Sequence, residues 1–196
     1  TSACLPICGN GTIATITIAI EEGLINPNTP GTVRLETPAG IVIAQYTQEG
    51  SKVKKVKLSN VLSYLHASDL TITSPQLGEL RFDVAYGGNF YAIIDVQQNF
   101  AGLEHFKAEE LVMMSRELRK RINQSYSFVH PDNSAINGCS HILWTGKTID
   151  EGSTARNAVF YGDKAIDRSP CGTGTSARMA QWHAKGKLIK GELFIH

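Results

Sequence analysis

The segment Cys171-Gly172-Thr173-Gly174-Thr175 follows the pattern C-G-x-G-T, and so does Cys8-Gly9-Asn10-Gly11-Thr12 near the other end of the chain. One glycine-rich pentapeptide would be weak evidence, but two copies that each begin with cysteine indicate an internal repeat. In a chain of 196 residues, this repeat predicts two related half-structures, each carrying one copy of the pattern.

A helix is expected after each copy of the pattern. Residues 176–185 are rich in helix-forming side chains, and Gly186 is placed to end the helix. Residues 13–20 are mostly β-branched, which favours a strand, but their isoleucines also share one helical face. The repeat favours a helix in both places, and the apolar character of residues 13–20 nearly all round predicts a helix buried inside a domain.

The start of each helix is suited to bind an anion. Glycines after the cysteine let backbone amides approach a ligand closely. The first amides of a helix have no partner within the helix, and the helix dipole favours negative charge at that end. Such an end binds a carboxylate without an arginine and lowers the pKa of a cysteine placed there. Two such ends facing each other would hold one carboxylate between the thiols of Cys8 and Cys171.

Two thiols fit the inversion of a stereocentre at Cα. The reaction removes a proton from one face and returns a proton to the other, so two groups of similar pKa can exchange roles in the two directions. Cysteine suits this work because its reference pKa of about 8.5 lies near working pH. Cys4 and Cys139 lack the repeated pattern, and we interpret them as small buried side chains.

Composition excludes several classes of protein. The formal charge of +1 gives no electrostatic reason to expect nucleic acid or an anionic membrane as a partner. No apolar run approaches the roughly 18 residues of a membrane span. The four cysteines form no CxxC pair, which argues against a zinc site and for reduced thiols in a cytoplasmic protein. The chain begins without Met and without a signal-like segment, so secretion is not indicated.

Short β-like runs separated by turn signals fill much of the remaining chain, and one amphipathic helix is expected at residues 108–122, with Asn123 as its stop. The basic residues of that helix, from Arg116 to Arg121, are interpreted as a solvated face. The expected strands are residues 32–36, 41–46, 52–58, 79–86 and 90–95.

The sequence resembles the proline racemase and hydroxyproline 2-epimerase family. Residues 167–177, Asp-Arg-Ser-Pro-Cys-Gly-Thr-Gly-Thr-Ser-Ala, resemble the second catalytic motif of that family, and residues 8–13 resemble its first. Residues 37–40 and 87–93 also resemble family segments, in the expected order. The resemblance implies a diaminopimelate-epimerase-like α+β fold with two pseudo-symmetric mixed domains, each a curved sheet around a central helix.

The resemblance also implies a division of the chain. Residues 1–125 would form the first catalytic half, with Cys8, and residues 126–196 the second, with Cys171. Family members usually begin well before the first motif and continue after a segment like Gly191-Glu192-Leu193-Phe194. We therefore expect a chain truncated at both ends.

The residues of the site follow from the same resemblance. Cys8 and Cys171 would be the acid/base pair, with no pyridoxal phosphate and no metal. Asp167 would bind the substrate ring nitrogen or help to set the protonation of the thiols. His141 stands where hydroxyproline epimerases carry histidine and would hydrogen-bond the 4-hydroxyl, and Tyr161 would form an aromatic wall. The backbone amides expected to bind the carboxylate are those of Gly9, Asn10, Gly172 and Thr173.

The predicted function is a cofactor-independent 4-hydroxyproline 2-epimerase, an isomerase acting on a small molecule, and the family suggests a homodimer. Proline racemase is an alternative, because Leu5 resembles the proline-type pocket. Hydroxyproline dehydratase is a weaker alternative, because dehydratases replace one of the thiols and both are present here. An inactive truncated member is a further alternative, because the chain is short for the family. Asn10, which cannot titrate, also departs from the family, which usually has histidine at this position.

Overall fold

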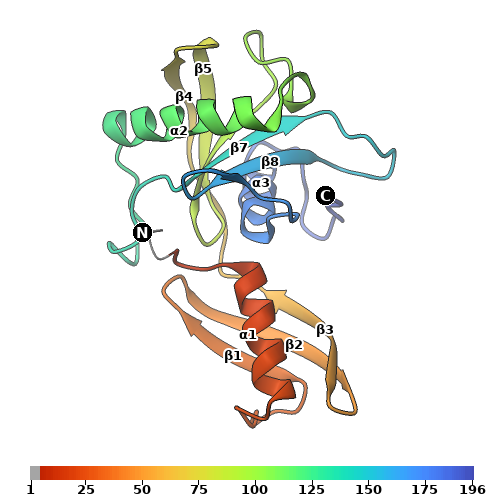
Figure 1. Cartoon of the computed structure of the whole chain (residues 1–196). Helices are drawn as coiled ribbons and strands as arrows, with labels where there is room; N and C mark the ends of the chain where they lie inside the picture. The colour runs from red at the N-terminus through yellow and green to blue at the C-terminus, as the bar shows by residue number, and fades with distance from the viewer. Residues whose placement is uncertain (1–4) are drawn as a thin grey trace.

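The computed structural model describes residues 5–196, which form a smaller and a larger α/β unit (Figure 1). The smaller unit contains one helix and a three-stranded sheet, and the larger unit contains a six-stranded sheet between two helices. In chain order the elements are α1 (Gly9–Glu21), β1 (Thr32–Thr37), β2 (Gly40–Glu49), β3 (Lys52–Ser59), β4 (Tyr64–Ser74), β5 (Gly78–Tyr86), β6 (Phe90–Ile94), the 3₁₀ turn η1 (Leu103–His105), α2 (Ala108–Ser125), β7 (His141–Gly146), β8 (Arg156–Tyr161), β9 (Ala165–Ile166) and α3 (Gly172–Ala184).

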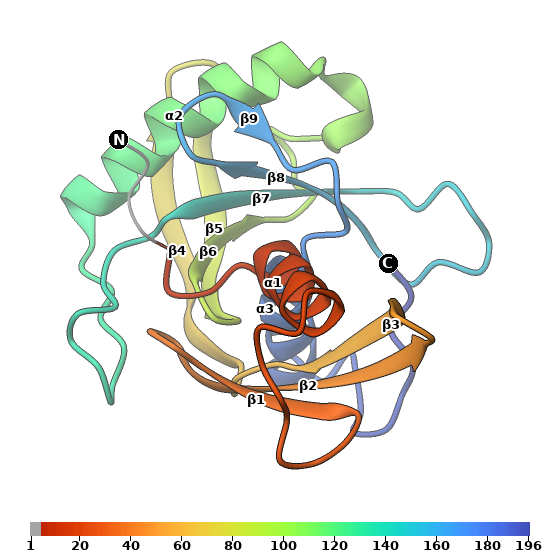
Figure 2. The ribbon, with the colours of Figure 1, turned by 60° about the horizontal axis from the view of Figure 1, so that its bottom comes forward.

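In the smaller unit, α1 lies on an antiparallel sheet of order β1-β2-β3 (Figure 2). Val42 and Ala44 alternate with exposed neighbours along β2 and are fully buried, as is expected when one face of a sheet is covered. Ile16 of α1 is also buried, whereas Ile18 is 56% exposed. The predicted helix is confirmed, but its predicted burial on all sides is wrong, because a three-stranded sheet covers only one side of it.

The larger sheet has the order β4-β5-β6-β7-β8-β9, in which only β6 and β7 are parallel. Figure 1 shows α2 on one face of the sheet and α3 on the other. Alternate residues of the central strands serve the two faces. Ala92 and Trp144 belong to the cluster beneath α2, and Tyr91 and Leu143 belong to the cluster beneath α3. Both faces of β6 and β7 are therefore buried, which makes them a rigid support for side chains.

The predicted architecture of two mixed units, each with a sheet curved against a helix that follows one C-G-x-G-T motif, is confirmed. The five expected strands are present as β1, β2, β3, β5 and β6. The chain passes from the smaller sheet to the larger between Ser59 and Tyr64, whereas the predicted boundary at residues 125 and 126 falls at the end of α2. The assignment of residues 1–125 and 126–196 to two catalytic halves stays a prediction.

For the helix predicted at residues 108–122, the stop at Asn123 is wrong, and the solvated face is confirmed for Arg116 and Lys120 but not for Arg119. Asn123 does not end the helix, because its side-chain amide pairs with the backbone N–H and C=O of Cys139 at 2.7 and 2.8 Å, and α2 continues to Ser125. Arg119 does not lie on a solvated face. Its guanidinium stacks 4.9 Å from the centre of the Phe160 ring and pairs with Asp163 at 2.9 Å.

Cys139 is buried, as predicted, and burial raises the pKa of its thiol to about 12. Cys4 lies outside the described residues. Between residues 5 and 196, none of the helices combines the length and the apolar composition that a membrane span requires.

Candidate active site

The starts of α1 and α3 meet at a cavity of about 150 Å³ that contains both motif cysteines. A cavity of roughly this size accommodates one small ring, such as benzene. The sequence-based site residues are brought together here, because all nine of them line the cavity: Cys8, Gly9, Asn10, His141, Tyr161, Asp167, Cys171, Gly172 and Thr173.

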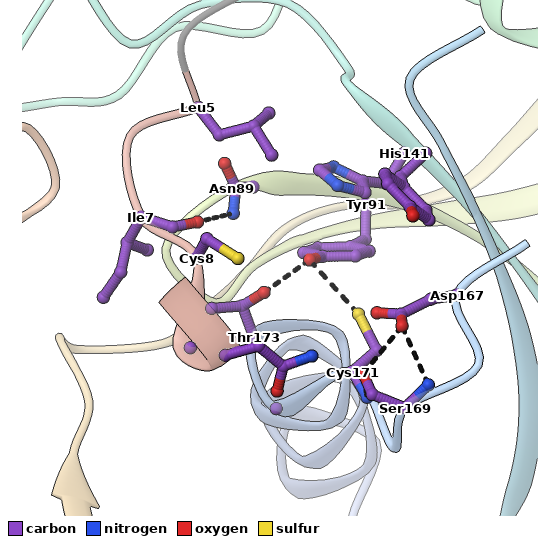
Figure 3. A pocket seen from close by; sticks show the side chains of 14 residues that line it. Leu5, Ile7, Cys8, Asn89, Tyr91, His141, Asp167, Ser169, Cys171 and Thr173 are labelled. Atoms are coloured by element: carbon purple, nitrogen blue, oxygen red, sulfur yellow. Dashed lines mark hydrogen bonds between the residues drawn. The ribbon is translucent and has the colours of Figure 1, made fainter. Parts of the chain in front are cut away.

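Each cysteine occupies the residue just before the first turn of its helix. Cys8 precedes α1 and is exposed, and Cys171 precedes α3 and is 7% exposed. The carbonyl of each cysteine accepts the first helical hydrogen bond, from Thr12 N–H at 2.9 Å and from Thr175 N–H at 2.7 Å. Figure 3 shows the two sulfur atoms turned toward the same space. Residues 163 positions apart in the sequence therefore present their thiols, with the free amides of two helix starts, to one cavity.

The backbone of Cys171 is strained and is held by a short chain of hydrogen bonds. Its φ of 53° lies in the left-handed region, which costs about 1–2 kcal/mol for a residue with a side chain. Asp167 Oδ1 accepts hydrogen bonds from the N–H and the hydroxyl of Ser169 at 2.9 and 2.7 Å. The Ser169 oxygen in turn accepts one from Cys171 N–H at 3.1 Å. Asp167 and Ser169 thus fix the position of the Cys171 thiol.

The pKa of the Cys171 thiol is raised to about 11, mainly by burial and in smaller part by the nearby charge of Asp167. Hydrogen bonds from Tyr91 and from the N–H of Gly174 act in the opposite direction but are weaker than the effect of burial. The first turn of α3 thus lowers this pKa through the N–H of Gly174, as expected, but burial outweighs it, and the net shift of the Cys171 pKa is upward instead of downward. Near neutral pH this side chain is a thiol and holds its proton.

Tyr91 links the thiol to the first turn of α3. Its hydroxyl lies 2.6 Å from Thr173 Oγ1 and 3.6 Å from Cys171 Sγ. Burial raises the pKa of Tyr91 well above its usual value, so the phenol stays neutral and keeps a proton to donate. If the Thr173 hydroxyl donates to Tyr91, the Tyr91 hydroxyl is free to donate to a Cys171 thiolate.

His141 lies beside Tyr91 because β6 and β7 are parallel and place the two residues in register. The rings are stacked with their centres 4.6 Å apart, and His141 Nδ1 lies 2.6 Å from Ser140 Oγ. Burial, reinforced by the charge of Arg119, lowers the pKa of His141 to about 4. The imidazole is therefore neutral and suited to hydrogen bonding. Tyr161, on β8, lies at the cavity and is 40% exposed.

Two glycines permit the close packing behind the thiols. A Cβ on Gly174 would lie 2.9 Å from Cys171 Sγ and 3.1 Å from Cε1 of Tyr91. A Cβ on Gly87 would lie 2.1 Å from the carbonyl oxygen of Thr173. The turn between β5 and β6 thus packs directly against the first turn of α3, and only glycine fits at both contacts.

Among the described residues, no group of His, Cys, Asp and Glu side chains is arranged to hold a metal ion. The cavity instead offers thiols, backbone amides, one carboxylate and neutral hydrogen-bonding groups. This set of groups can bind a small carboxylic acid and move a proton to or from it.

A family model described as proline racemase matches residues 1–196. The chain belongs to the proline racemase family. It is 66% identical over 196 residues to a 4-hydroxyproline 2-epimerase of Spirosoma linguale, covering 100% of this chain and 59% of that protein. It is 57% identical, with the same coverage, to a 4-hydroxyproline epimerase of Brucella ovis. The chain thus spans about three fifths of the length of these relatives of the proline racemase family.

A solved structure of this family has the same fold. A hydroxyproline epimerase of Agrobacterium vitis with bound trans-4-hydroxy-L-proline superposes with a TM-score of 0.86 at 35% identity, covering 97% of this chain and 55% of that one. The predicted family and its fold are confirmed.

Besides Leu5, which was named for the pocket, four residues at the cavity were not among the predicted site residues: Ile7, Asn89, Tyr91 and Ser169. Ser169 stands between Asp167 and Cys171 in the second motif, so its position in the motif was the available signal. Asn89 and Tyr91 lie in the segment 87–93, which resembles the proline racemase family, but no repeat or charge distinguished them from core residues.

Proposed function

We propose that this protein is a cofactor-independent 4-hydroxyproline 2-epimerase in which Cys8 and Cys171 are the acid and base. The observation that carries the proposal is that both thiols line one cavity of about 150 Å³, each at the start of a helix. A base on one side of Cα and an acid on the other are what inversion requires.

The substrate carboxylate would lie between the two helix starts. The amides of Gly9 and Asn10 open α1, and those of Gly172 and Thr173 open α3, so all four belong to turns with unpaired N–H groups. Both helix dipoles favour a negative charge there. When Cα loses its proton, charge moves onto the carboxylate oxygens, and the same amides stabilise the carbanion-like transition state.

The reaction consists of two proton transfers that balance. One thiolate takes the proton from Cα and becomes a thiol, and the opposite thiol gives its proton to the other face and becomes a thiolate. The enzyme thus ends with the roles of Cys8 and Cys171 exchanged, and the reverse reaction restores them. The raised pKa of Cys171 supports its role as the proton donor in one direction. In that direction Cys8 is the base.

Asp167 and His141 would orient the ring. The carboxylate of Asp167 lies at the cavity and is suited to bind the charged ring nitrogen. The neutral imidazole of His141 is suited to hydrogen-bond the 4-hydroxyl, and Tyr161 provides an aromatic surface at the cavity. The names of the relatives from Spirosoma linguale and Brucella ovis, and the hydroxyproline bound to the Agrobacterium vitis protein, support hydroxyproline as the substrate.

Proline racemase is the second candidate function. Leu5, which resembles the proline-type pocket, lines the cavity and offers only an apolar side chain to the ring. Dehydration of hydroxyproline is less favoured, because both thiols are retained and both lie at the cavity.

Incubation with trans-4-hydroxy-L-proline in D₂O, without added cofactor, tests the proposal. An epimerase changes the optical rotation and incorporates deuterium at Cα, whereas a dehydratase releases a pyrroline product. We expect Cys8→Ser and Cys171→Ser each to lower the rate of inversion by at least about 100-fold. Cys139→Ser is the matched control, because Cys139 is buried away from the cavity. Full activity in either variant of the pair would refute the two-thiol mechanism, and no exchange by the unaltered chain would support an inactive member of the family.

We also propose that the protein acts in the cytoplasm as a homodimer on this small-molecule substrate. The free thiols of Cys8, Cys139 and Cys171 support a reducing compartment. Light scattering of the purified protein measures the mass in solution, and a monomer would contradict the second part of this proposal.

A further inference from the structure

His141 and Tyr161 form a wall of the cavity that is provided by the larger sheet and not by the helix starts. Ile142 of β7 pairs with Phe160 of β8 in an antiparallel register, so His141 and Tyr161 are the next residues along the two strands. Because side chains alternate along a strand, Phe160 faces α2 while Tyr161 faces the cavity. The His141–Tyr161 wall therefore stands where β7 begins and β8 ends.

One side chain from α2, on the opposite face of the sheet, is bonded to the backbone beside both residues of this wall. Nη1 of Arg119 donates a hydrogen bond of 3.2 Å to the carbonyl oxygen of Ser140, the residue before His141. The same nitrogen donates to the carbonyl oxygen of Gly162, the residue after Tyr161. Ser140 in turn contacts the imidazole, since its Oγ lies 2.6 Å from His141 Nδ1. A single guanidinium thus joins the two strand ends that carry the wall.

The guanidinium of Arg119 is itself held in one orientation. It stacks 4.9 Å from the centre of the Phe160 ring, and its Nη2 pairs with Asp163 at 2.9 Å. A planar guanidinium fixed on three sides loses little further freedom when it donates to two carbonyl groups. The charge of Arg119 also acts on the wall, because it is the second cause, after burial, of the lowered pKa of His141.

The end of β8 has little other support on its outer side. β9 (Ala165–Ile166), the edge strand of the larger sheet, pairs with β8 through only two residue pairs. A short edge ladder of this kind adds few hydrogen bonds to hold Tyr161 in place. The turn between the two strands lies beside α2, where Arg119 reaches it (Figure 2). The contacts of Arg119 therefore supply the anchor that the short ladder lacks.

We propose that Arg119 is a positioning residue that holds His141 and Tyr161 as a preformed wall for the substrate ring. This inference rests on the proposed epimerase function and extends it. Arg119 is not among the residues that line the cavity, so it acts through the wall. The two thiols and the amides proposed to bind the carboxylate belong to the starts of α1 and α3, which Arg119 does not hold. Loosening the wall should therefore weaken binding of the ring and leave proton transfer at Cα intact.

The test measures KM and kcat of Arg119→Met with trans-4-hydroxy-L-proline. We expect KM to rise about 5- to 30-fold, because two loosened side chains must be ordered again each time the substrate binds. We expect kcat to stay within about 3-fold, since the lost interaction favours the bound substrate and the transition state equally. Arg121→Met is the matched control. It removes a guanidinium from the same helix, but Arg121 pairs with Glu117 of that helix at 2.6 Å, and KM should not change.

A merely structural role of Arg119 predicts a different result. Partial unfolding of Arg119→Met would lower the apparent kcat and leave KM unchanged, because the molecules that remain folded keep an intact wall. That result, or unchanged values of both constants, would overturn the inference while the epimerase function stands. If Arg119→Met does not fold, Arg119→Lys, which keeps the charge without the planar fork, is measured with the same readout. If the unaltered chain inverts neither hydroxyproline nor proline, the proposed function itself fails and this inference fails with it.

Discussion

Replacing Tyr91 with Phe removes one hydroxyl from the site and leaves the ring in place. The hydroxyl lies 2.6 Å from Thr173 Oγ1 and 3.6 Å from Cys171 Sγ, and it counteracts part of the rise in the pKa of Cys171 that burial causes. Without it, the Cys171 thiolate loses a neutral donor in a buried environment. We therefore expect Tyr91→Phe to slow the inversion of Cα.

The size of the effect follows from the hydrogen bond that is lost. A hydrogen bond to a charged group contributes about 1.5–3 kcal/mol, which corresponds to about a 10- to 150-fold lower rate. The pKa of Cys171, already raised to about 11, rises further, because the lost donor stabilised the charged form. The part of the pH–rate profile that depends on Cys171 ionisation should therefore shift to higher pH.

The assay is the rate of epimerisation in both directions as a function of pH. The equilibrium constant between the epimers fixes the ratio of kcat/KM in the two directions, so both must fall by the same factor. Tyr126→Phe is the control, because it removes a hydroxyl that donates to the Thr71 carbonyl at 2.7 Å, away from the cavity. Full activity and an unchanged pH profile in Tyr91→Phe would show that the hydroxyl does not act on the thiol.

Two further predictions concern the packing and the charge of the site. Gly174→Ala would place a Cβ 2.9 Å from Cys171 Sγ, and we expect it to lower the stability by about 1–3 kcal/mol and to lower the activity strongly. Gly11→Ala, the equivalent change in the first motif, would place a Cβ no closer than 3.6 Å to its neighbours, which is an ordinary contact. Thermal unfolding and rate measurements should therefore show a far smaller effect for Gly11→Ala. His141 has a pKa lowered from 6.5 to about 4, so the unfolded chain binds its proton at a higher pH than the folded protein does. Stability to urea should therefore fall by up to about 3 kcal/mol as the pH decreases from 6.5 to 4. His141→Asn should lack this contribution, and an unchanged pH dependence in that variant would contradict the assignment.

The parts of the site that could be predicted from the sequence are those that depend on a few consecutive residues. The repeat identified both cysteines and both helices, since a helix start and its glycines occupy a few consecutive residues. Tyr91 could not be found in this way, because its partner Cys171 is 80 residues away and the contact depends on the packing of α3 against β6. The same non-local packing buries Cys171 and reverses the predicted direction of its pKa shift.

Among the strands that the sequence did not predict, β4 and β7 each lack a clear alternation of polar and apolar residues, for different reasons. β4 (Tyr64–Ser74) contains two register irregularities and a left-handed residue, Asp69, with a φ of 55°, so its polar and apolar residues do not alternate cleanly. β7 is buried on both faces between α2 and α3, and its short apolar run therefore lacks the alternation that marks a strand.

The position of deuterium after the first turnovers in D₂O tests the central claim most directly. Protiated trans-4-hydroxy-L-proline is converted to a small extent in D₂O, the two epimers are separated, and the mass of each is measured by mass spectrometry. If the Cys8 and Cys171 thiols act from opposite faces, the new epimer carries one deuterium at Cα and the remaining substrate carries none. Deuterium in the remaining substrate, or protium retained in the new epimer, would point to a single group acting on both faces and would contradict the account.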